Sequence, residues 1–428
     1  MSTNRMHAVL TPVGSSGDVN PFVIVGRELR RRGHLVTLIA PAVFAGVASN
    51  AGLDFVPVGT REEYERATNN PDLWHPRRGV AVALTEVVRY LRPAYAAIER
   101  VYHPNETMIV GHALSFPSRV FEETHRVPAA TLHLAPSIFR SDFKQPALPS
   151  GSDVSSWPRW AKRALWWGVD RFLVDPLVAP ALNAWRAELG LPPASRIFNT
   201  WFHSPQRLIG LFPNWFGDPQ PDWPSQLRLA GFVLSDDSCA PDERPMGLSS
   251  DLEEFVGAGG APIVFTPGTA NRHAAAFFRT AIDATAAIQR RAVLVTPYRE
   301  HLPAALPPHV HHAGYAPFDR LFPRASAVVH HGGIGTCAQG FAAGVPQLLM
   351  PMGFDQPDNA ARISRLGVGE AIVPTRFTAE RVAASLTRLL SSDNVAIACR
   401  RWSAETFALN GARNACDLLE EQFDCFIG

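Results

Sequence analysis

Short apolar runs alternate with amphipathic stretches through the first forty residues. His7–Pro12 is an apolar run of strand length, and Leu35–Ile39 is a second one. The residues between them predict a loop over 13–21 and then an amphipathic helix from about Phe22 to Arg32, which Gly33 ends. A strand, a helix and a second strand in this order form a βαβ unit. The pattern therefore predicts a parallel sheet covered by helices.

The alternation continues along the chain and starts again in its second half. Between Ser235 and Gly260 the composition shifts to Asp, Pro and Gly, which indicates a connection between domains. We therefore expect an N-terminal domain over 1–234, a linker over 235–260 and a C-terminal domain over 261–428. Further strands are expected at Phe55–Pro57, Met108–Val110, Ala129–Leu134, Ile263–Phe265, Ala292–Val295 and Ala327–His330, with a helix near His273–Arg290.

An aromatic-rich stretch interrupts this pattern between Phe143 and Pro193. Trp160, Trp167 and Val174 are seven residues apart, as on one face of a helix. We expect a buried helical layer here. A lining for an apolar ligand and a surface that rests on a membrane are the alternatives.

Composition narrows the class of protein. The 428 residues include 40 Lys and Arg against 39 Asp and Glu, a net charge of +1, which argues against a nucleic-acid binder. Five cysteines without a CxxC pair argue against a disulfide scaffold or a structural zinc site. No run reaches the roughly 18–20 apolar residues of a spanning helix, and the first residues do not resemble a secretion signal. We expect a cytoplasmic protein, with a peripheral contact to the inner membrane as an open alternative.

The clearest chemical motif is a glycine-rich turn between a strand and a helix. The run Ala327–His330 is followed by His331-Gly332-Gly333-Ile334-Gly335-Thr336, and a helix continues through Gln339–Ala342. Such a turn directs backbone N–H groups and the helix dipole at an anion, to which His331 and Thr336 would add hydrogen bonds. Neighbouring residues on a strand face opposite ways, so His330 and His331 are not expected to serve one ligand or a dinuclear metal site. A tight structural corner is the alternative.

A second polar motif follows the apolar run Leu348–Pro351. Asp355 and Gln356 then lie at the carboxyl edge of the predicted sheet, where α/β proteins bind ligands. A carboxylate beside an amide suits the vicinal hydroxyls of a sugar. Helix capping by Asp355 is the alternative.

The loop Gly14-Ser-Ser-Gly17-Asp18 does not fit a dinucleotide site. Its GxGxxG spacing is incomplete, and an acid in the loop would repel a pyrophosphate. The second strand also ends at Ala40-Pro41 without the acid that holds a ribose. Asp18 is better suited to face a neutral hydroxyl as a general base. Capping of the following helix is an equally natural role for Asp18, and the two roles are compatible.

Taken together, these motifs resemble those of the family-1 nucleotide-sugar glycosyltransferases. The donor signature of that family is similar to a run that begins at Gly314-Tyr315-Ala316-Pro317. This run continues through the glycine turn and Gly344-Val-Pro346 to Asp355–Asn359. Gly14–Pro21 resembles the first loop of its bacterial branch, which includes sterol, glycopeptide and macrolide glycosyltransferases. The segments 198–205 and 212–215 resemble the rhamnosyltransferase second subunit of rhamnolipid synthesis. The resemblance covers nearly the whole chain.

The resemblance implies a GT-B fold, in which two facing Rossmann-like domains leave a cleft and a C-terminal helix crosses back. It implies inversion at the anomeric carbon without a metal or other cofactor. No Asp-x-Asp motif is present to hold a divalent ion. Carried over by position, the resemblance implies that Tyr315 and the Ala316 backbone contact the nucleobase. It implies that His331 and the amides of Gly333, Gly335 and Thr336 bind the diphosphate, and that Asp355 and Gln356 bind the sugar. Gly268 and Thr269 would lie on the phosphate and acceptor side, and Asn359 would support the ribose or phosphate region.

The implied reaction is transfer of a hexose from a UDP-glucose-type or dTDP-rhamnose-type donor to a hydroxyl of an apolar small molecule or lipid. Asp18 falls where the bacterial relatives carry their catalytic Asp, and His133 or His112 is a candidate to assist it. We place Gly17, Trp160 and Trp167 on the acceptor side. Tyr315 and Phe318 depart from the family's usual Trp and Gln, which leaves UDP or dTDP open. A nucleotide-sugar epimerase or hydrolase and a non-catalytic partner subunit are the alternative functions. The sequence does not determine the oligomeric state.

Overall fold

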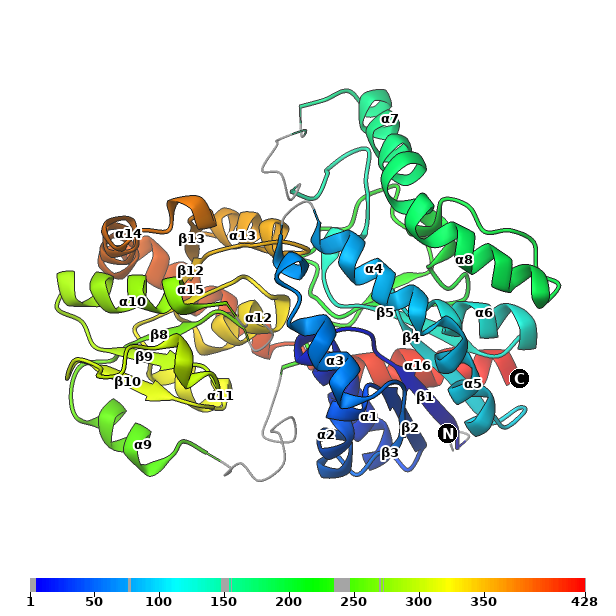
Figure 1. The fold of residues 1–428 in the computed structure, drawn as a ribbon, viewed down its shortest axis with the longest axis horizontal. Helices are drawn as coiled ribbons and strands as arrows, with labels where there is room; N and C mark the ends of the chain where they lie inside the picture. Colours follow the sequence, from blue (N-terminus) through cyan, green and yellow to red (C-terminus); the bar gives the residue numbers. More distant parts are fainter. Residues whose placement is uncertain are drawn as a thin grey trace. The chain divides into compact units, whose positions relative to one another are not determined.

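The computed structural model describes residues 5–75, 78–147, 154, 156–234, 247–268, 271 and 273–427 (Figure 1). The chain divides into two compact units. The first contains the described residues up to Leu73, from 78 to Val233 and from Asn410 onward. The second contains the described residues of 234–409 together with Trp74 and His75.

The first unit is built on a seven-stranded parallel sheet with the order β3-β2-β1-β4-β5-β6-β7. Strand β1 pairs with β2 on one side and with β4 on the other, so that His7 lies opposite both Leu35 and Thr107. The strands are apolar and mostly buried, as parallel strands covered on both faces are. Their bounds are β1 His7–Thr11, β2 Leu35–Ala40, β3 Asp54–Pro57, β4 Thr107–His112, β5 Ala129–His133, β6 Leu208–Gly210 and β7 Leu227–Leu229.

Helices flank this sheet, and the C-terminal helix is one of them. The side chain of Arg32 binds Asp417 at 2.6 Å and Glu420 at 2.7 Å, which ties the end of the chain to the first helix. The α-helices are α1 Ser16–Arg31, α2 Ala45–Asn50, α3 Arg61–Thr68, α4 Gly79–Arg89, α5 Leu91–Val101, α6 Phe116–His125, α7 Arg159–Val169, α8 Asp175–Glu188 and α16 Gly411–Ile427, with π-helical turns η4 at Asp170–Val174 and η5 at Ile197–Trp201.

The second unit has a six-stranded parallel sheet with the order β10-β9-β8-β11-β12-β13. Its strands are β8 Ile263–Thr266, β9 Ala292–Val295, β10 Val310–Ala313, β11 Ala327–His330, β12 Gln347–Leu349 and β13 Gly369–Ala371. The α-helices are α9 Ser250–Gly257, α10 Ala275–Ala287, α11 Phe318–Leu321, α12 Ile334–Ala343, α13 Gln356–Arg365, α14 Ala379–Ser391 and α15 Asp393–Phe407.

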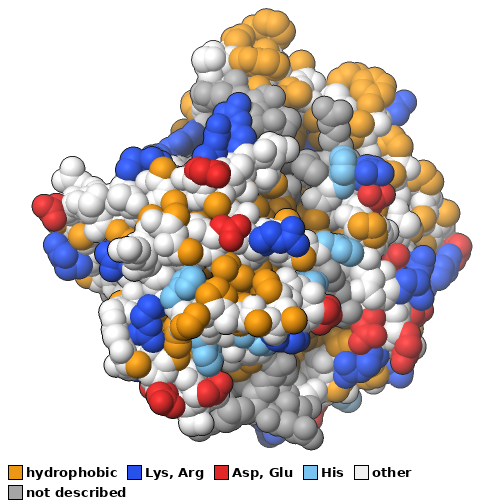
Figure 2. Space-filling model, turned by 60° about the vertical axis from the view of Figure 1, so that its left-hand side comes forward, with side chains coloured by type: hydrophobic (Ala, Val, Ile, Leu, Met, Phe, Trp, Pro, Cys, Tyr) orange, Lys and Arg blue, Asp and Glu red, His pale blue; other side chains and the backbone are white. Residues whose placement is uncertain are grey.

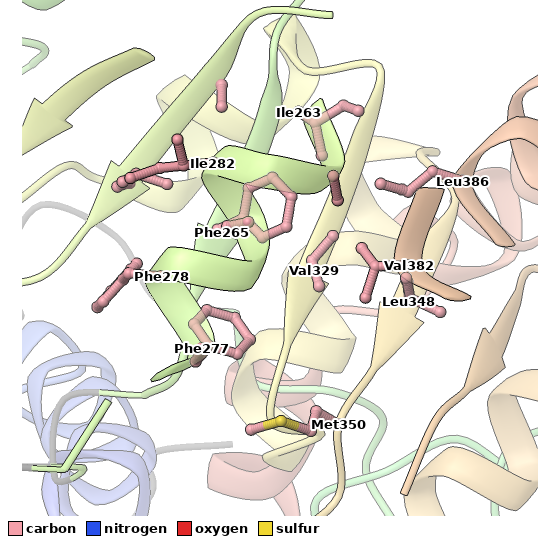
Figure 3. Packing of buried hydrophobic residues seen from close by; sticks show 14 of the residues in the cluster. Ile263, Phe265, Phe277, Phe278, Ile282, Val329, Leu348, Met350, Val382 and Leu386 are labelled. Atoms are coloured by element: carbon pink, nitrogen blue, oxygen red, sulfur yellow. The ribbon is translucent and has the colours of Figure 1, made fainter. Parts of the chain in front are cut away.

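A core of aliphatic and aromatic side chains joins one face of this sheet to two helices (Figure 3). Phe265 and Val329 project from the central strands toward Phe277 of α10 and Val382 of α14. These side chains are at most a few per cent exposed, so the core fixes the strands whose carboxyl ends carry the polar motifs.

The expected α/β class, with two parallel sheets and a C-terminal helix that returns to the first unit, is confirmed. The predicted start of the first helix is wrong, because α1 begins at Ser16 and not near Phe22. Pro21 lies inside the helix, where its missing N–H costs one bond to the Gly17 carbonyl. The helix starts early because Ser15 caps it and Asp18 bonds back to Ser15. Of the expected linker over 235–260, residues 235–246 lie outside the described residues, and α9 occupies part of the rest.

The predicted buried helical layer is confirmed at Trp185, which is 4% exposed, and is wrong at Trp160 and Trp167. Trp160 is 72% and Trp167 55% exposed on α7, whereas Val174 is buried. The five-residue π-turn η4 follows α7 and ends at Val174, and it changes the number of residues per turn. Val174 is thereby rotated away from the face that the seven-residue spacing predicted.

The four described cysteines are free thiols, three of them buried and Cys425 exposed. Among the described residues, no helix is both long and apolar enough to cross a membrane.

Candidate active site

Both sheets have a point where the strand order reverses. In the first unit it lies between β1 and β4, and in the second between β8 and β11. Ligands of open α/β sheets bind outside the carboxyl ends of the strands at such a point. Asp18 follows β1, His112 ends β4, Gly268 follows β8 and His331 follows β11. The sequence motifs therefore lie where this fold binds ligands.

Asp18 is held by the turn that starts α1. Its Oδ2 accepts hydrogen bonds from the Ser15 N–H at 2.8 Å and from the Ser15 hydroxyl at 3.2 Å. Asp18 is thus not the N-cap but the third helical residue, which bonds back to the capping Ser15. Burial raises the pKa of this half-buried carboxyl group to about 6. A carboxyl group with that pKa is a better proton acceptor than an ordinary one and still ionises at neutral pH.

Gly14 makes room for this carboxylate. Its φ of +133° is a conformation that residues with a side chain rarely adopt. A Cβ on Gly14 would lie only 2.2 Å from Asp18 Oδ2. The glycine therefore allows the carboxylate to fold back over the loop. Gly17, the other loop glycine, is exposed and has no such neighbour.

His112 lies at the neighbouring strand end. Its Nδ1 accepts the N–H of Leu114 at 3.2 Å, so in the neutral ring the proton is on Nε2. Burial lowers the pKa of His112 to about 4, and its ring meets Phe22 of α1 edge-on. A neutral ring with its proton on Nε2 can donate a hydrogen bond there, but it cannot accept a proton at that atom.

His133 is deeply buried. Only 1% of the residue is exposed, and Nε2 lies 3.0 Å from His203 Nδ1. Burial and the neighbouring histidines hold the pKa of His133 well below its ordinary value. The rings of Phe139 and Phe202 close around it. His133 thus packs in the core of the first unit, and its catalytic role stays a prediction.

In the second unit, His331 lies between two glycines. A Cβ on Gly268 would lie 2.7 Å from the ring, and one on Gly333 would lie 2.5 Å from its Nε2. Burial lowers the pKa of His331 to about 4, so the ring is neutral at pH 7. Its Nδ1 is buried and has no hydrogen-bond partner among the described residues.

The turn after His331 is fixed from both sides. The Gly332 N–H donates to His330 Nδ1 at 3.1 Å, and the Gly332 carbonyl accepts from Asn359 Nδ2 at 2.9 Å. His330 is fully buried and directs its Nε2 to Gln347. His330 therefore supports the turn from the core.

Helix α12 begins directly behind this turn. Gly333 occupies its N-cap position, and no side chain caps the helix there. The first N–H groups of an α-helix have no partner within the helix, and the helix dipole is positive at that end. Gly335 and Thr336 lie in this first turn and are half-buried. The arrangement of His331 and these amides suits a phosphate or diphosphate.

Asp355 ends the loop after β12, Gln356 begins α13, and the two side chains differ in their surroundings. Asp355 is half-buried and accepts a hydrogen bond from Asn359 Nδ2 at 2.7 Å, and it does not cap α13 through its side chain. Gln356 is buried, and its Oε1 accepts the N–H of Met352 at 2.8 Å. The predicted sugar contact therefore fits Asp355, whereas the Gln356 carbonyl is used within the loop.

Four further residues expected on the donor side differ in their surroundings. Tyr315 is half-buried in the loop after β10, at the same carboxyl edge as His331, and Ala316 beside it is buried. Asn359 is fully buried, so any support that it gives to the phosphate region acts through Gly332 and Asp355. Thr269 lies outside the described residues.

Comparison with known proteins agrees with this arrangement. Residues 8–129 match the N-terminal domain of glycosyltransferase family 28, and residues 279–412 match the C-terminal domain of proteins like erythromycin biosynthesis protein CIII. The chain is 30% identical to O-mycaminosyltylonolide 6-deoxyallosyltransferase of Streptomyces fradiae over 97% of each chain. It belongs to the family-1 glycosyltransferases of GT-B fold.

Solved structures show the same fold. The glycotransferase of kitacinnamycin superimposes with a TM-score of 0.74 at 22% identity and covers 98% of this chain and 100% of its own. The spinosyn rhamnosyltransferase SpnG, solved with thymidine diphosphate, gives a TM-score of 0.65 at 18% identity and covers 95% of this chain and 98% of its own.

The aromatic motif at 198–205 of this glycosyltransferase has a structural role. Trp201 Nε1 donates to Glu123 at 2.8 Å, and Arg119 bonds both the Trp201 carbonyl and Glu122. His203 packs against His133 in the same core. Among the described residues, no group of three or more His, Cys, Asp or Glu side chains is placed to hold a metal ion.

Sequence reasoning missed the residues that position the site. Gly14 and Ser15 hold Asp18, and Gly332 with His330 holds the turn at His331. The signal for Gly14 was present, since an acid four residues after a glycine in a strand–helix loop can fold back onto it. The contact of Asn359 with Gly332 spans 27 residues and leaves no local pattern.

Proposed function

We propose that this glycosyltransferase moves a hexose from a nucleoside diphosphate to a hydroxyl of an apolar acceptor with inversion and without a metal ion. Asp18 is the observation that carries the proposal. It is a carboxyl group at the switch point of the first sheet, positioned by Ser15 and Gly14, with its pKa raised to about 6.

In the proposed reaction the acceptor oxygen attacks the anomeric carbon as the bond to the diphosphate breaks. Asp18 takes the hydroxyl proton while the new C–O bond forms, because an alcohol becomes acidic enough only at that stage. Both hydrogen bonds that described residues donate to Asp18 end on Oδ2, so we assign proton acceptance to Oδ1. Gly17, exposed beside Asp18, lies on the acceptor side.

We assign the donor to the second unit. The leaving diphosphate gains negative charge, which His331 and the first N–H groups of α12 would stabilise. Asp355 would accept hydrogen bonds from sugar hydroxyls, and Tyr315 would flank the nucleobase. The thymidine diphosphate bound to the spinosyn rhamnosyltransferase favours a dTDP-sugar over a UDP-sugar.

The proposal is tested with dTDP- and UDP-sugars and a panel of apolar hydroxylated acceptors. We expect a new glycoside whose anomeric configuration is opposite to that of the donor, as measured by proton NMR. A product that retains the donor configuration would contradict the single displacement. Release of free sugar that no acceptor accelerates would instead indicate a hydrolase.

A further inference from the structure

Helix α7 exposes two of its tryptophans and buries its lysine. Trp160 and Trp167 face outward, as does Trp157 just before the helix. On the inner side Lys162 is only 3% and Asp170 only 2% exposed. A helix that covers a protein core normally shows the opposite distribution, with its apolar face inward. The outer side of α7 is therefore suited to an apolar environment beyond the protein.

The inner side of α7 is held in place by specific contacts. Lys162 Nζ donates to the Phe143 carbonyl at 3.2 Å, and Asp170 binds Arg140 at 2.5 Å. Trp166 Nε1 donates to Gln145 at 2.6 Å. These contacts fix the rotation of the helix. The outward direction of Trp160 and Trp167 is thus a defined feature of the fold.

The apolar surface continues past the end of α7 through the π-turn η4. Phe172 and Leu173 are each more than 60% exposed, and the rings of Trp167 and Phe172 meet edge-on at 5.7 Å. We call this surface the α7 face. Its members are Trp157, Trp160, Trp167, Phe172, Leu173 and Leu177. Hydrophobic side chains are visible at the top of Figure 2, at the level of α7 in Figure 1.

The charges around the α7 face are positive. Arg159, Arg163 and Arg171 are all exposed. The described carboxylates of the surrounding segments 142–147 and 156–177 are not exposed: Asp142 pairs with Arg163, Asp170 pairs with Arg140, and Asp175 accepts backbone N–H groups. Exposed arginines interleaved with Trp, Phe and Leu are typical of a helix that lies in the plane of a membrane interface.

We infer that the α7 face binds the surface of a bilayer that contains anionic lipid. The Trp and Phe side chains enter the boundary between headgroups and acyl chains, and Arg159 and Arg171 contact lipid phosphates. A protein partner would be expected to supply carboxylates to these arginines and a shaped pocket to each ring. The positive charge and the chemically uniform apolar surface favour the bilayer. This inference does not depend on the proposed function, and it replaces the acceptor-side role expected for Trp160 and Trp167.

The test is flotation of the full chain with vesicles of phosphatidylcholine mixed with phosphatidylglycerol, compared with vesicles of phosphatidylcholine alone. We expect the chain to bind the mixed vesicles, and we expect added salt to weaken this binding. The double variant Trp160→Gln, Trp167→Gln is expected to bind about a hundredfold more weakly, at about tenfold per ring withdrawn from the interface. Arg171→Gln is expected to lose about fivefold.

Matched controls come from other exposed surfaces. Ile397→Gln combined with Phe407→Gln removes two exposed apolar side chains from α15, and Arg61→Gln removes an exposed charge from α3. Both controls are expected to bind vesicles like the wild-type chain. If the double Trp variant does not fold, as its melting temperature would show, the single Trp160→Gln variant serves in its place.

Several results would overturn the inference. One is an absence of binding to mixed vesicles by the wild-type chain, and another is equal binding by the double Trp variant. A wild-type oligomer that this variant converts to a monomer in gel filtration would assign the face to a second copy of the chain. A raised acceptor KM with unchanged vesicle binding would assign it to the acceptor.

Discussion

Replacing Asp18 by Asn removes a proton acceptor and keeps the shape of the side chain. The amide oxygen of Asn can still accept the Ser15 N–H that Asp18 Oδ2 accepts at 2.8 Å, so the start of α1 should be preserved. If Asp18 is the general base, turnover should fall by about 10²–10⁴-fold, which is the usual contribution of such a group. Affinity for the nucleotide should change little, because we assign nucleotide binding to the second unit.

The raised pKa of Asp18 adds a second, independent expectation. The folded state holds this proton more tightly than the unfolded chain, whose carboxyl group has its ordinary pKa of 3.8. The stability that Asp18 contributes is therefore complete below pH 3.8 and is lost as the pH rises through about 6. The difference between the folded and unfolded pKa values of Asp18 corresponds to at most about 3 kcal/mol of folding free energy. Partial exposure of the side chain reduces this contribution to about 1 kcal/mol.

The Asn variant should consequently be more stable than the wild-type chain at pH 8 and less active. We expect its melting temperature at that pH to rise by about 2–4 °C. The wild-type kcat/KM should fall on the acid side with an apparent pKa of about 6. Asp54→Asn, at an exposed carboxylate on β3, is the matched control and should change neither quantity.

The assay measures turnover, nucleotide affinity and melting temperature on the same preparations across pH 5–9. Near wild-type turnover of the Asn variant would refute the base assignment and leave Asp18 as a capping residue. Reduced turnover together with a lower melting temperature at pH 8 would refute the reasoning from burial, because loss of structure would then explain the loss of activity.

Four further predictions follow from the same geometry. Gly14→Ala should lower turnover about a hundredfold by displacing the Asp18 carboxylate, to which we assign the base. Gly33→Ala, which also has a positive φ but open space around it, should affect stability alone; equal effects would contradict this. His331→Ala should cost about 2.7–4 kcal/mol in kcat/KM, and unchanged kinetics would remove it from the mechanism. Activity should survive excess EDTA, because His331 and backbone amides are assigned to the diphosphate, and a loss restored by Mg²⁺ or Mn²⁺ would oppose that assignment. Burial lowers the pKa of His133 and lowers that of His203 to about 3. The stability that these histidines contribute as neutral rings is therefore present above pH 6.5 and lost as the pH falls. The melting temperature should accordingly fall from pH 7 to pH 5.

The sequence predicted the sheets and the glycine turn well because both depend on local patterns. A parallel strand buried on both faces appears as a short apolar run, and β11 has the predicted bounds Ala327–His330. The turn from His331 to Thr336 follows that strand directly, so its place at the carboxyl edge of the sheet follows from strand direction alone. Neither inference needs knowledge of distant contacts.

Distant contacts explain what the sequence reasoning missed. His133 ends a strand at the expected edge, and only the packing of Phe139 and His203 around it shows that it is a core residue. The seven-residue spacing of Trp160 and Trp167 assumed a continuous α-helix up to Val174, and η4 breaks that regularity. Asn359 is buried and donates a hydrogen bond to Gly332, which lies outside its own helix.

The two units position their reactive side chains by the same device. Gly14 leaves room for the Asp18 carboxylate, as Gly268 and Gly333 leave room for the His331 ring. In each case a Cβ would come within 3 Å of the side chain that we assign to the chemistry. A glycine after a strand is usually explained by backbone conformation, yet Gly333 has an ordinary φ of −60° that alanine would adopt freely. Its requirement is therefore space beside the imidazole, and Gly333→Ala should weaken nucleotide binding while leaving the fold intact.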